Sequence, residues 1–190
     1  APDLYTAYRV ETLGNVFKVP SAQKEVNIEA KIRKIQTSME DPLVHCSKLT
    51  DQTLNRSVVK YAHSRCLPEH LFGDLYAVSD VNLVTKRIHK YKEQDFPELP
   101  ALVIPFFKVD GEYDFIQCRI SEPCEKEFRF VTLQVQEGPK VWGQKYLNWK
   151  DTVYIFEGPI DAMFINNAVA LAGAASGLDF MIETARAKGI

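Results

Sequence analysis

The stretch VYIFEGPIDA, residues 153–162, decides the fold of this 190-residue chain. Its first four residues form a continuous apolar run of the kind expected for a buried parallel strand. A glycine and a proline end the run, and residues 160–166 favour a short helix, because proline suits the first turn of a helix. Residues 168–172 are a second short apolar run, and residues 178–188 favour a closing helix. The order strand, helix, strand, helix predicts the start of a parallel sheet with right-handed crossovers.

The residues before this stretch favour antiparallel strands and, further upstream, helices. Residues 101–107 and 113–120 are apolar runs separated by Asp110-Gly111, which is a strong hairpin signal. Residues 128–135 are a further predicted strand, whereas helical periodicity appears at 28–39, 53–63 and 81–91. The sequence therefore predicts an α/β chain in three parts. These are a helical to mixed N-terminal subdomain (1–100), an antiparallel β section (101–150) and the parallel section (151–190).

Composition and charge exclude several classes of protein. With 46% hydrophobic and 25% charged residues, the chain is neither disordered nor collagen-like. No apolar run reaches the roughly 18 residues of a membrane helix, so we expect no membrane partner and a cytoplasmic location. The net charge of −2 gives no global basic surface. Residues 31–92 nevertheless hold eleven Lys/Arg against six Asp/Glu, which is consistent with a template path, a partner surface or an ordinary solvated surface.

The cysteines and the N-terminus bear on metal content and processing. Cys46, Cys66, Cys118 and Cys124 form no Cys-x-x-Cys pair, so we expect reduced thiols and no structural zinc. The chain begins Ala1-Pro2-Asp3, with neither an initiator methionine nor a signal peptide. We expect a processed chain or a piece of a longer protein.

Glu157 and Asp161 are the candidate metal ligands. Glu157 follows the predicted strand directly, so its carboxylate is expected in the crevice where α/β sheets bind ligands. Asp161, four residues on, is expected to face the same crevice, and Gly158 leaves room for close approach. Two carboxylates there suit Mg²⁺ or Mn²⁺, completed by water and phosphate oxygens. The alternative is that Asp161 only stabilises the N-terminus of the following helix.

The order of motifs resembles a known family. Residues 153–173 contain Glu157-Gly158-x-x-Asp161-Ala162 and then Asn167-Ala168-Val169-Ala170-x-x-Gly173. They resemble the first half of a Toprim domain, the fold shared by bacterial-type primases, topoisomerases and related nucleases. The likeness extends over about residues 61–190, and the order of its motifs is more specific than any single one.

Upstream segments narrow the resemblance to primases. Residues 102–106, the Asp110-Gly111 turn and residues 115–119 resemble the segment before Toprim in bacterial and phage primases. Tyr61-x-x-Ser64-Arg65-x-Leu67-Pro68 is similar to the motif that opens this region. Residues 141–147 resemble the stretch that leads into the catalytic strand of the phage versions.

The resemblance implies Mg²⁺-dependent synthesis of short RNA primers on single-stranded DNA from ribonucleoside triphosphates during DNA replication. It raises a replicative helicase as a partner and, for a phage protein, the host cytoplasm as location. Glu157 would be the general acid/base or a metal-facing carboxylate, with Asp161 and Gly173 supporting the crevice. Template or nucleotide contacts would come from Arg119, Lys140, Lys145 and Arg65. Alternatively, Arg119 pairs with Glu122 or Glu127, and the two lysines are ordinary surface residues.

Two departures from the family pattern keep other functions open. The family ends its next strand in Asp-x-Asp, and here the chain stops at residues 187–190, where that strand is expected to begin; we expect a truncated chain. The zinc ribbon usual in such primases is also missing. One alternative is a Toprim nuclease or topoisomerase-like enzyme. The other is a non-catalytic module that binds single-stranded nucleic acid and lacks the second acidic motif.

Overall fold

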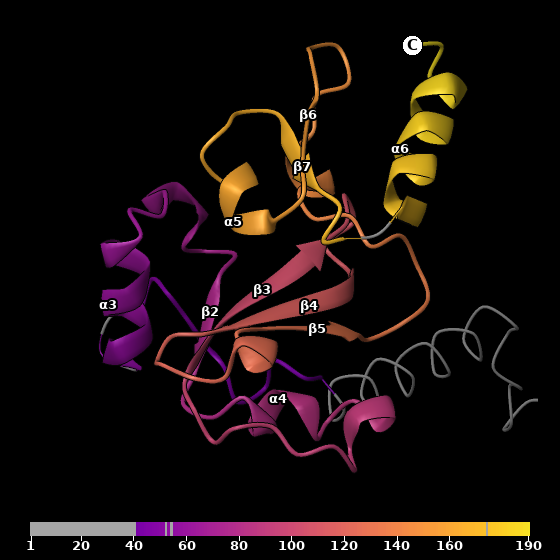
Figure 1. Ribbon diagram of the computed structural model, residues 1–190. Helices are drawn as coiled ribbons and strands as arrows, with labels where there is room; N and C mark the ends of the chain where they lie inside the picture. Colours follow the sequence, from indigo (N-terminus) through magenta and orange to yellow (C-terminus); the bar gives the residue numbers. More distant parts are fainter. Residues whose placement is uncertain (1–40, 52, 54, 174) are drawn as a thin grey trace, which may run out of the picture. The chain divides into compact units, whose positions relative to one another are not determined.

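The computed structural model describes residues 41–51, 53, 55–173 and 175–190 (Figure 1). The chain divides into two compact units, Ala1–Asp41 and Pro42–Ile190, and nearly all described residues belong to the second. The helix predicted over residues 28–39 therefore lies outside the described residues. The second unit holds the main sheet and the candidate site.

A five-stranded antiparallel sheet in the order β1-β2-β3-β4-β5 dominates this unit. Its strands are Ser47–Lys48, Tyr76–Val78, Ala101–Phe107, Tyr113–Ile120 and Phe130–Gln134. The turn between β3 and β4 closes with a hydrogen bond from the Lys108 amide to the Glu112 carbonyl at 2.8 Å. Gly111 supplies the φ of +88° that this turn adopts. The predicted hairpin is confirmed, whereas β5 begins later than predicted because Lys126–Phe128 form a 3-10 turn, η3.

Alternate residues of β3 enter two separate cores. Leu102, Ile104 and Phe106 join one cluster, which includes residues of helix α3 (Arg56–Ser64). Ala101 and Val103 join a second cluster on the opposite face of the sheet. Helix α3 confirms the helix predicted over residues 53–63, and it lies beside β2 and β3 (Figure 1). The uninterrupted apolar character of β3 is thus explained by burial on both faces.

The single helix predicted over residues 81–91 is wrong. Helix α4 covers only Asn82–Thr85, and a 3-10 turn, η2, follows at His89–Tyr91. Between them Ile88 has extended backbone angles, φ −98° and ψ 115°, and its side chain is buried in the second cluster. The Tyr91 hydroxyl accepts a hydrogen bond from the Gln134 amide of β5 at 3.0 Å. These tertiary contacts outweigh the local helical preference of the segment.

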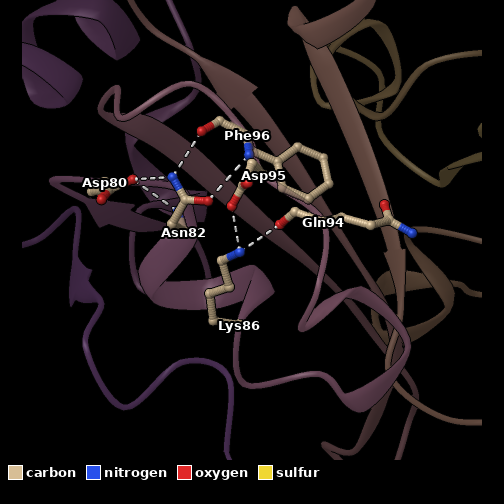
Figure 2. A network of polar contacts seen from close by, with 6 residues as sticks. All are labelled: Asp80, Asn82, Lys86, Gln94, Asp95 and Phe96. Atoms are coloured by element: carbon tan, nitrogen blue, oxygen red, sulfur yellow. Dashed lines mark hydrogen bonds and ion pairs between the residues drawn. The ribbon is translucent and has the colours of Figure 1, made fainter.

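A polar network fastens α4 to the segment that leads toward β3 (Figure 2). The Asn82 amide group donates to Asp80 Oδ1 at 3.0 Å and to the Phe96 carbonyl at 2.9 Å. Asn82 Oδ1 accepts from the Phe96 amide at 3.2 Å. Lys86, directly after α4, forms an ion pair with Asp95 at 2.7 Å. The network fixes the path of the chain around α4 and so keeps its apolar side against the second cluster.

A parallel pair of short strands follows the main sheet. Strands β6 (Tyr154–Phe156) and β7 (Ala168–Ala170) are joined through helix α5 (Pro159–Ala162), which lies beside them (Figure 1). The predicted parallel strands and their helical crossover are confirmed, although the helix is shorter than residues 160–166. Helix α6 covers Ala175–Ala187, close to the predicted 178–188.

The predicted burial of β6 is wrong. Tyr154 is 50% exposed and Ile155 is 46% exposed, whereas all of β7 is buried. Strand β7 is covered because Trp142 bridges to Ala170 along its second edge and Met181 of α6 belongs to the same cluster as Val169. Strand β6 has β7 as its only neighbouring strand among the described residues.

Pro42–Ile190 combines an antiparallel sheet, a parallel strand pair and helices, which confirms the α/β class. Strands β2 and β3 pair with each other across residue 100, and the division of the chain at residues 100 and 150 stays a prediction. No helix in the described part of the chain is both long and apolar enough to cross a membrane.

Candidate active site

The carboxyl ends of β6 and β7 are locked together by backbone hydrogen bonds. The Leu171 amide donates to the Phe156 carbonyl at 3.0 Å, and the Ala172 amide donates to the Glu157 carbonyl at 2.8 Å. Ala172 and Gly173 then take φ values of +46° and +75°, which turn the chain sharply away from the strand end. Glu157 therefore has a fixed backbone position, although the strand it follows is short.

Glu157 and Asp161 are both exposed to solvent. Pro159 begins α5, so Asp161 comes within the first turn after Glu157. A Cβ atom built on Gly158 would lie 3.2 Å from Asp161 Oδ2, which places this carboxylate close over the glycine backbone. Neither carboxylate forms a side-chain hydrogen bond or ion pair with the described residues. Both are therefore available to a cation.

The pair fits a divalent cation that takes few protein ligands. Carboxylate oxygens are hard donors, and Mg²⁺ is commonly bound by one or two of them together with water and substrate phosphates. Among the residues that the structure describes, no group of three or more His, Cys, Asp or Glu side chains is arranged to hold a metal ion. The donor set thus suits Mg²⁺ or Mn²⁺ shared with a nucleotide. It does not suit a closed site built from protein ligands alone.

Arg119 lies on β4 and is held by hydrogen bonds to two other segments. Its Nε donates to the Tyr61 hydroxyl of α3 at 2.9 Å, and its Nη1 donates to the Arg129 carbonyl at 3.0 Å. Within the described residues it forms no ion pair, so the alternative pairing with Glu122 or Glu127 is not formed. Arg119 is therefore a positioned cation that no carboxylate of the described residues neutralises.

Lys145 has a carboxylate partner within the fold. Its Nζ lies 2.7 Å from Asp74, and the Tyr146 hydroxyl donates to the same carboxylate at 2.7 Å. Burial by itself raises the pKa of Asp74, but the hydrogen bonds from Lys145 and Tyr146 outweigh it and hold the pKa below the ordinary 3.8. Burial, together with Asp74, raises the pKa of Tyr146. The network joins the loop before β2 to the turn η4 (Gln144–Tyr146).

Asp74→Asn is expected to lower the free energy of unfolding by about 1 kcal/mol at pH 7. Because the folded pKa of Asp74 lies below the unfolded value, its contribution is full above about pH 4 and is lost as the pH falls further. The deficit of the variant should therefore shrink as the pH falls below about 4. Urea denaturation at several pH values measures this. Asp95→Asn, at an exposed ion pair, is the control, and an equal effect at both positions would contradict the prediction.

The basic residues predicted to contact template or nucleotide do not form one cluster. Arg119 is paired with Leu102 of β3, whereas the Lys145 ammonium lies 5.1 Å from the ring of Phe107 at the far end of the same strand. Five residues of strand separate these two positions, or about 17 Å. Lys140 is partly buried, which lowers its pKa, and Arg65 is exposed directly after α3.

Two features of the structure were missed by sequence reasoning. Asp74, the partner of Lys145, stands 71 positions away in the chain, and no local pattern relates the two. Phe130 of β5 packs on the Arg119 guanidinium, 4.4 Å from its ring centroid, and is 50% exposed. The exposure of Phe130 could have been found from the period of two in a strand. This period places Phe130 on the same face as Thr132 and on the face opposite to the buried Val131.

The structure also contains an open cavity of about 360 Å³ between η4 and the segment after α5. Trp142, Tyr146, Asn148, Met163 and Asn167 contribute to its lining. None of the site residues predicted from the sequence lines it, although Tyr146 and Ala162, the residues directly after Lys145 and Asp161, do.

Comparison with known proteins bears on the whole chain. No protein-family model matches it. The chain is 26% identical over 183 residues to the DNA primase of Enterobacteria phage T4, in an alignment that covers 94% of this chain and 51% of the phage protein. It thus spans about half the length of this curated relative.

Among solved structures, the chain is similar to the crystal structure of the Aquifex aeolicus primase that contains the zinc-binding and RNA polymerase domains. The TM-score is 0.51 at 16% identity, and the match covers 70% of this chain and 41% of the other. At this identity the likeness shows a shared fold. In sequence and in fold, the chain therefore resembles DNA primases of the phage and bacterial type, as the order of its motifs predicted.

Proposed function

We propose that this chain belongs to the catalytic part of a DNA primase and joins ribonucleotides into short RNA primers on single-stranded DNA. The observation that supports it most is the placement of Glu157 and Asp161 at the open carboxyl end of a parallel strand pair, in a chain similar to a phage DNA primase over nearly its whole length. The proposal includes a Toprim domain that carries these two acids, a location in the cytoplasm of the host cell, and a replicative helicase as partner.

The reaction forms a bond between a 3′-hydroxyl oxygen and the α-phosphorus of a ribonucleoside triphosphate, and pyrophosphate leaves. A bound divalent cation supplies charge neutralisation for the triphosphate and makes the hydroxyl more acidic. Asp161 and Glu157 are the residues that would hold this cation. Glu157, whose backbone carbonyl accepts a hydrogen bond from Ala172, would also accept the proton of the hydroxyl.

The template and nucleotide phosphates are assigned to the basic residues. Arg119 is the best supported of them, because it is positioned by hydrogen bonds yet has no carboxylate partner among the described residues. Arg65 and Lys140 are further candidates. Lys145 would contact a phosphate only by sharing or leaving Asp74, so its contribution is expected to be the smallest.

The test is template-directed incorporation of labelled ribonucleotides. The chain is incubated with single-stranded DNA, ribonucleoside triphosphates and Mg²⁺, and products are separated by length. Short RNA that requires template, Mg²⁺ and Glu157 supports the proposal. Cleavage of the DNA with no RNA product would overturn it in favour of a nuclease.

A non-catalytic module that binds single-stranded nucleic acid is the second candidate. It is favoured by one observation, that the described residues contribute two carboxylates to the site and no third ligand. Such a module would bind single-stranded DNA equally well with and without Mg²⁺, and substitution of Glu157 would leave every measured property unchanged.

Gly158→Ala is expected to weaken Mn²⁺ binding by about tenfold with little change in melting temperature. The added methyl group would lie 3.2 Å from Asp161 Oδ2 and displace that carboxylate. The backbone is not strained, because φ −110° and ψ 140° suit any residue. Electron paramagnetic resonance titration with Mn²⁺ measures the affinity. Gly73→Ala, at a glycine with open space around it, is the matched control, and equal affinities for the two variants would contradict the prediction.

A further inference from the structure

The α3 side of β4 and β5 carries a row of polar and aromatic residues. Arg119 is paired with Phe130 across the two strands, and Gln117 is paired with Thr132. Arg119 contacts Tyr61 of α3, which shows that this row faces the α3 side of the sheet. The residues that alternate with the row belong to the apolar cluster on the opposite face. Within this row Gln117 is buried, whereas Arg119 is half-buried and Phe130 is 50% exposed, so the accessible surface is the Arg119–Phe130 pair.

Arg119 lies between two aromatic rings on this surface. Its guanidinium carbon is 4.4 Å from the ring centroid of Phe130 and 5.7 Å from that of Tyr61. Hydrogen bonds from Nε to Tyr61 and from Nη1 to the Arg129 carbonyl fix its plane. Cation–π contact of this kind orients the guanidinium and lowers the entropy that it loses on binding a ligand.

Both partners of this contact keep unused binding capacity. An arginine has five N–H donors, and two of those of Arg119 are engaged. The ring of Phe130 is 50% exposed although phenylalanine gains most from burial, so a large part of its surface meets solvent. An open aromatic ring beside a fixed guanidinium offers a stacking face together with donors for acceptor oxygens.

We infer that Phe130 and Arg119 form a stacking site for an unpaired nucleobase of single-stranded nucleic acid, with Tyr61 as the residue that positions the guanidinium. This inference deepens the proposed function and rests on it. Stacking on such a site is tolerant of sequence, because every base has a π face. The exposed Arg129, directly before Phe130, and the exposed Arg65, one helical turn after Tyr61, supply positive charge for the adjoining phosphates.

Charge alone does not make this surface a nucleic-acid site. The loop between β4 and β5 carries exposed Glu122, Glu125 and Glu127 beside Lys126. The stacking contact is therefore expected to supply most of the affinity here. A loss of the ring should lower the affinity while leaving its salt dependence almost unchanged, since salt dependence reports phosphate contacts.

The test is fluorescence anisotropy of the full chain with a labelled oligothymidylate and with an abasic oligonucleotide of equal length. Phe130→Ala is expected to weaken binding to the oligothymidylate about tenfold and to leave the abasic affinity unchanged. Phe164→Ala, at a phenylalanine that is 49% exposed, is the matched control and should bind like the original chain. Phe130→Trp should retain affinity, and its fluorescence should be quenched when the oligothymidylate binds.

The outcomes separate this inference from the proposed function. Equal affinities of the Phe130→Ala and Phe164→Ala variants, or no change in emission of a Phe130→Trp variant that still binds, would overturn the stacking site alone. That result would indicate that the exposed Phe130 ring contacts a protein partner instead of a nucleobase. If the original chain binds neither oligonucleotide, both the stacking site and the proposed function are overturned.

Discussion

Glu157→Gln is expected to lower template-directed ribonucleotide incorporation by at least about a hundredfold while the fold is unchanged. The amide keeps the shape of the side chain but removes the negative charge and the basic oxygen. Both roles proposed for Glu157, holding a divalent cation and accepting a proton, are lost together. The residue is exposed and its hydrogen bond to Ala172 uses the backbone carbonyl, so the substitution removes no contact that stabilises the strand pair.

The measurement has two readouts besides synthesis. Mn²⁺ affinity by electron paramagnetic resonance should fall sharply, and single-stranded DNA affinity by anisotropy should stay within about twofold, because the proposed template contacts lie on other residues. Glu183→Gln on α6, another exposed glutamate, is the control and should change none of the three. Unfolding of the Glu157→Gln variant, or synthesis at the original rate, would contradict the assignment of Glu157 as a catalytic residue.

Elements specified by local chemistry could be predicted from the sequence. The Asp110-Gly111 turn fixes the β3–β4 hairpin, since Gly111 takes a φ of +88° there. The parallel strand pair follows from two short apolar runs separated by a proline that begins a helix. The position of Glu157 after β6 follows from the same pattern, and a Cβ atom on Gly158 would lie 3.2 Å from Asp161 Oδ2.

The errors come from contacts between distant residues. The helix predicted over residues 81–91 is too long, because Ile88 packs in the second cluster and Tyr91 accepts a hydrogen bond from β5. The helical period of the sequence contains no information about these contacts. Strand β6 has the composition of a buried strand, but burial depends on neighbouring elements, and within the described part of the chain β7 is the one strand beside it. Likewise, Arg119 donates a hydrogen bond to Tyr61, which is 58 positions away in the chain. Arg119 could therefore be predicted as a candidate from the sequence, but its contact with Tyr61 could not.

The backbone pairing of Trp142 with β7 connects the segment before β6 to the strand beside the candidate site. Trp142 and Ala170 exchange two backbone hydrogen bonds, of 2.8 and 3.1 Å. Directly after Trp142, Gly143 has a φ of +95°, and a Cβ atom there would lie 2.6 Å from the Ala168 carbonyl oxygen. The backbone of this segment and that of β7 approach so closely that only glycine fits between them.

Gly143→Ala is therefore expected to lower the free energy of unfolding by about 3 kcal/mol, from the left-handed backbone together with the overlap. Gly111→Ala is the control, because Gly111 has a similar φ of +88° and open space around it; its loss should be about 1 kcal/mol. Urea denaturation compares the two, and equal losses would show that the overlap is relieved at no cost. Since the Ala172 amide that fixes Glu157 comes shortly after β7, movement of β7 in the Gly143→Ala variant should also weaken Mn²⁺ binding, which the Gly111→Ala variant should retain.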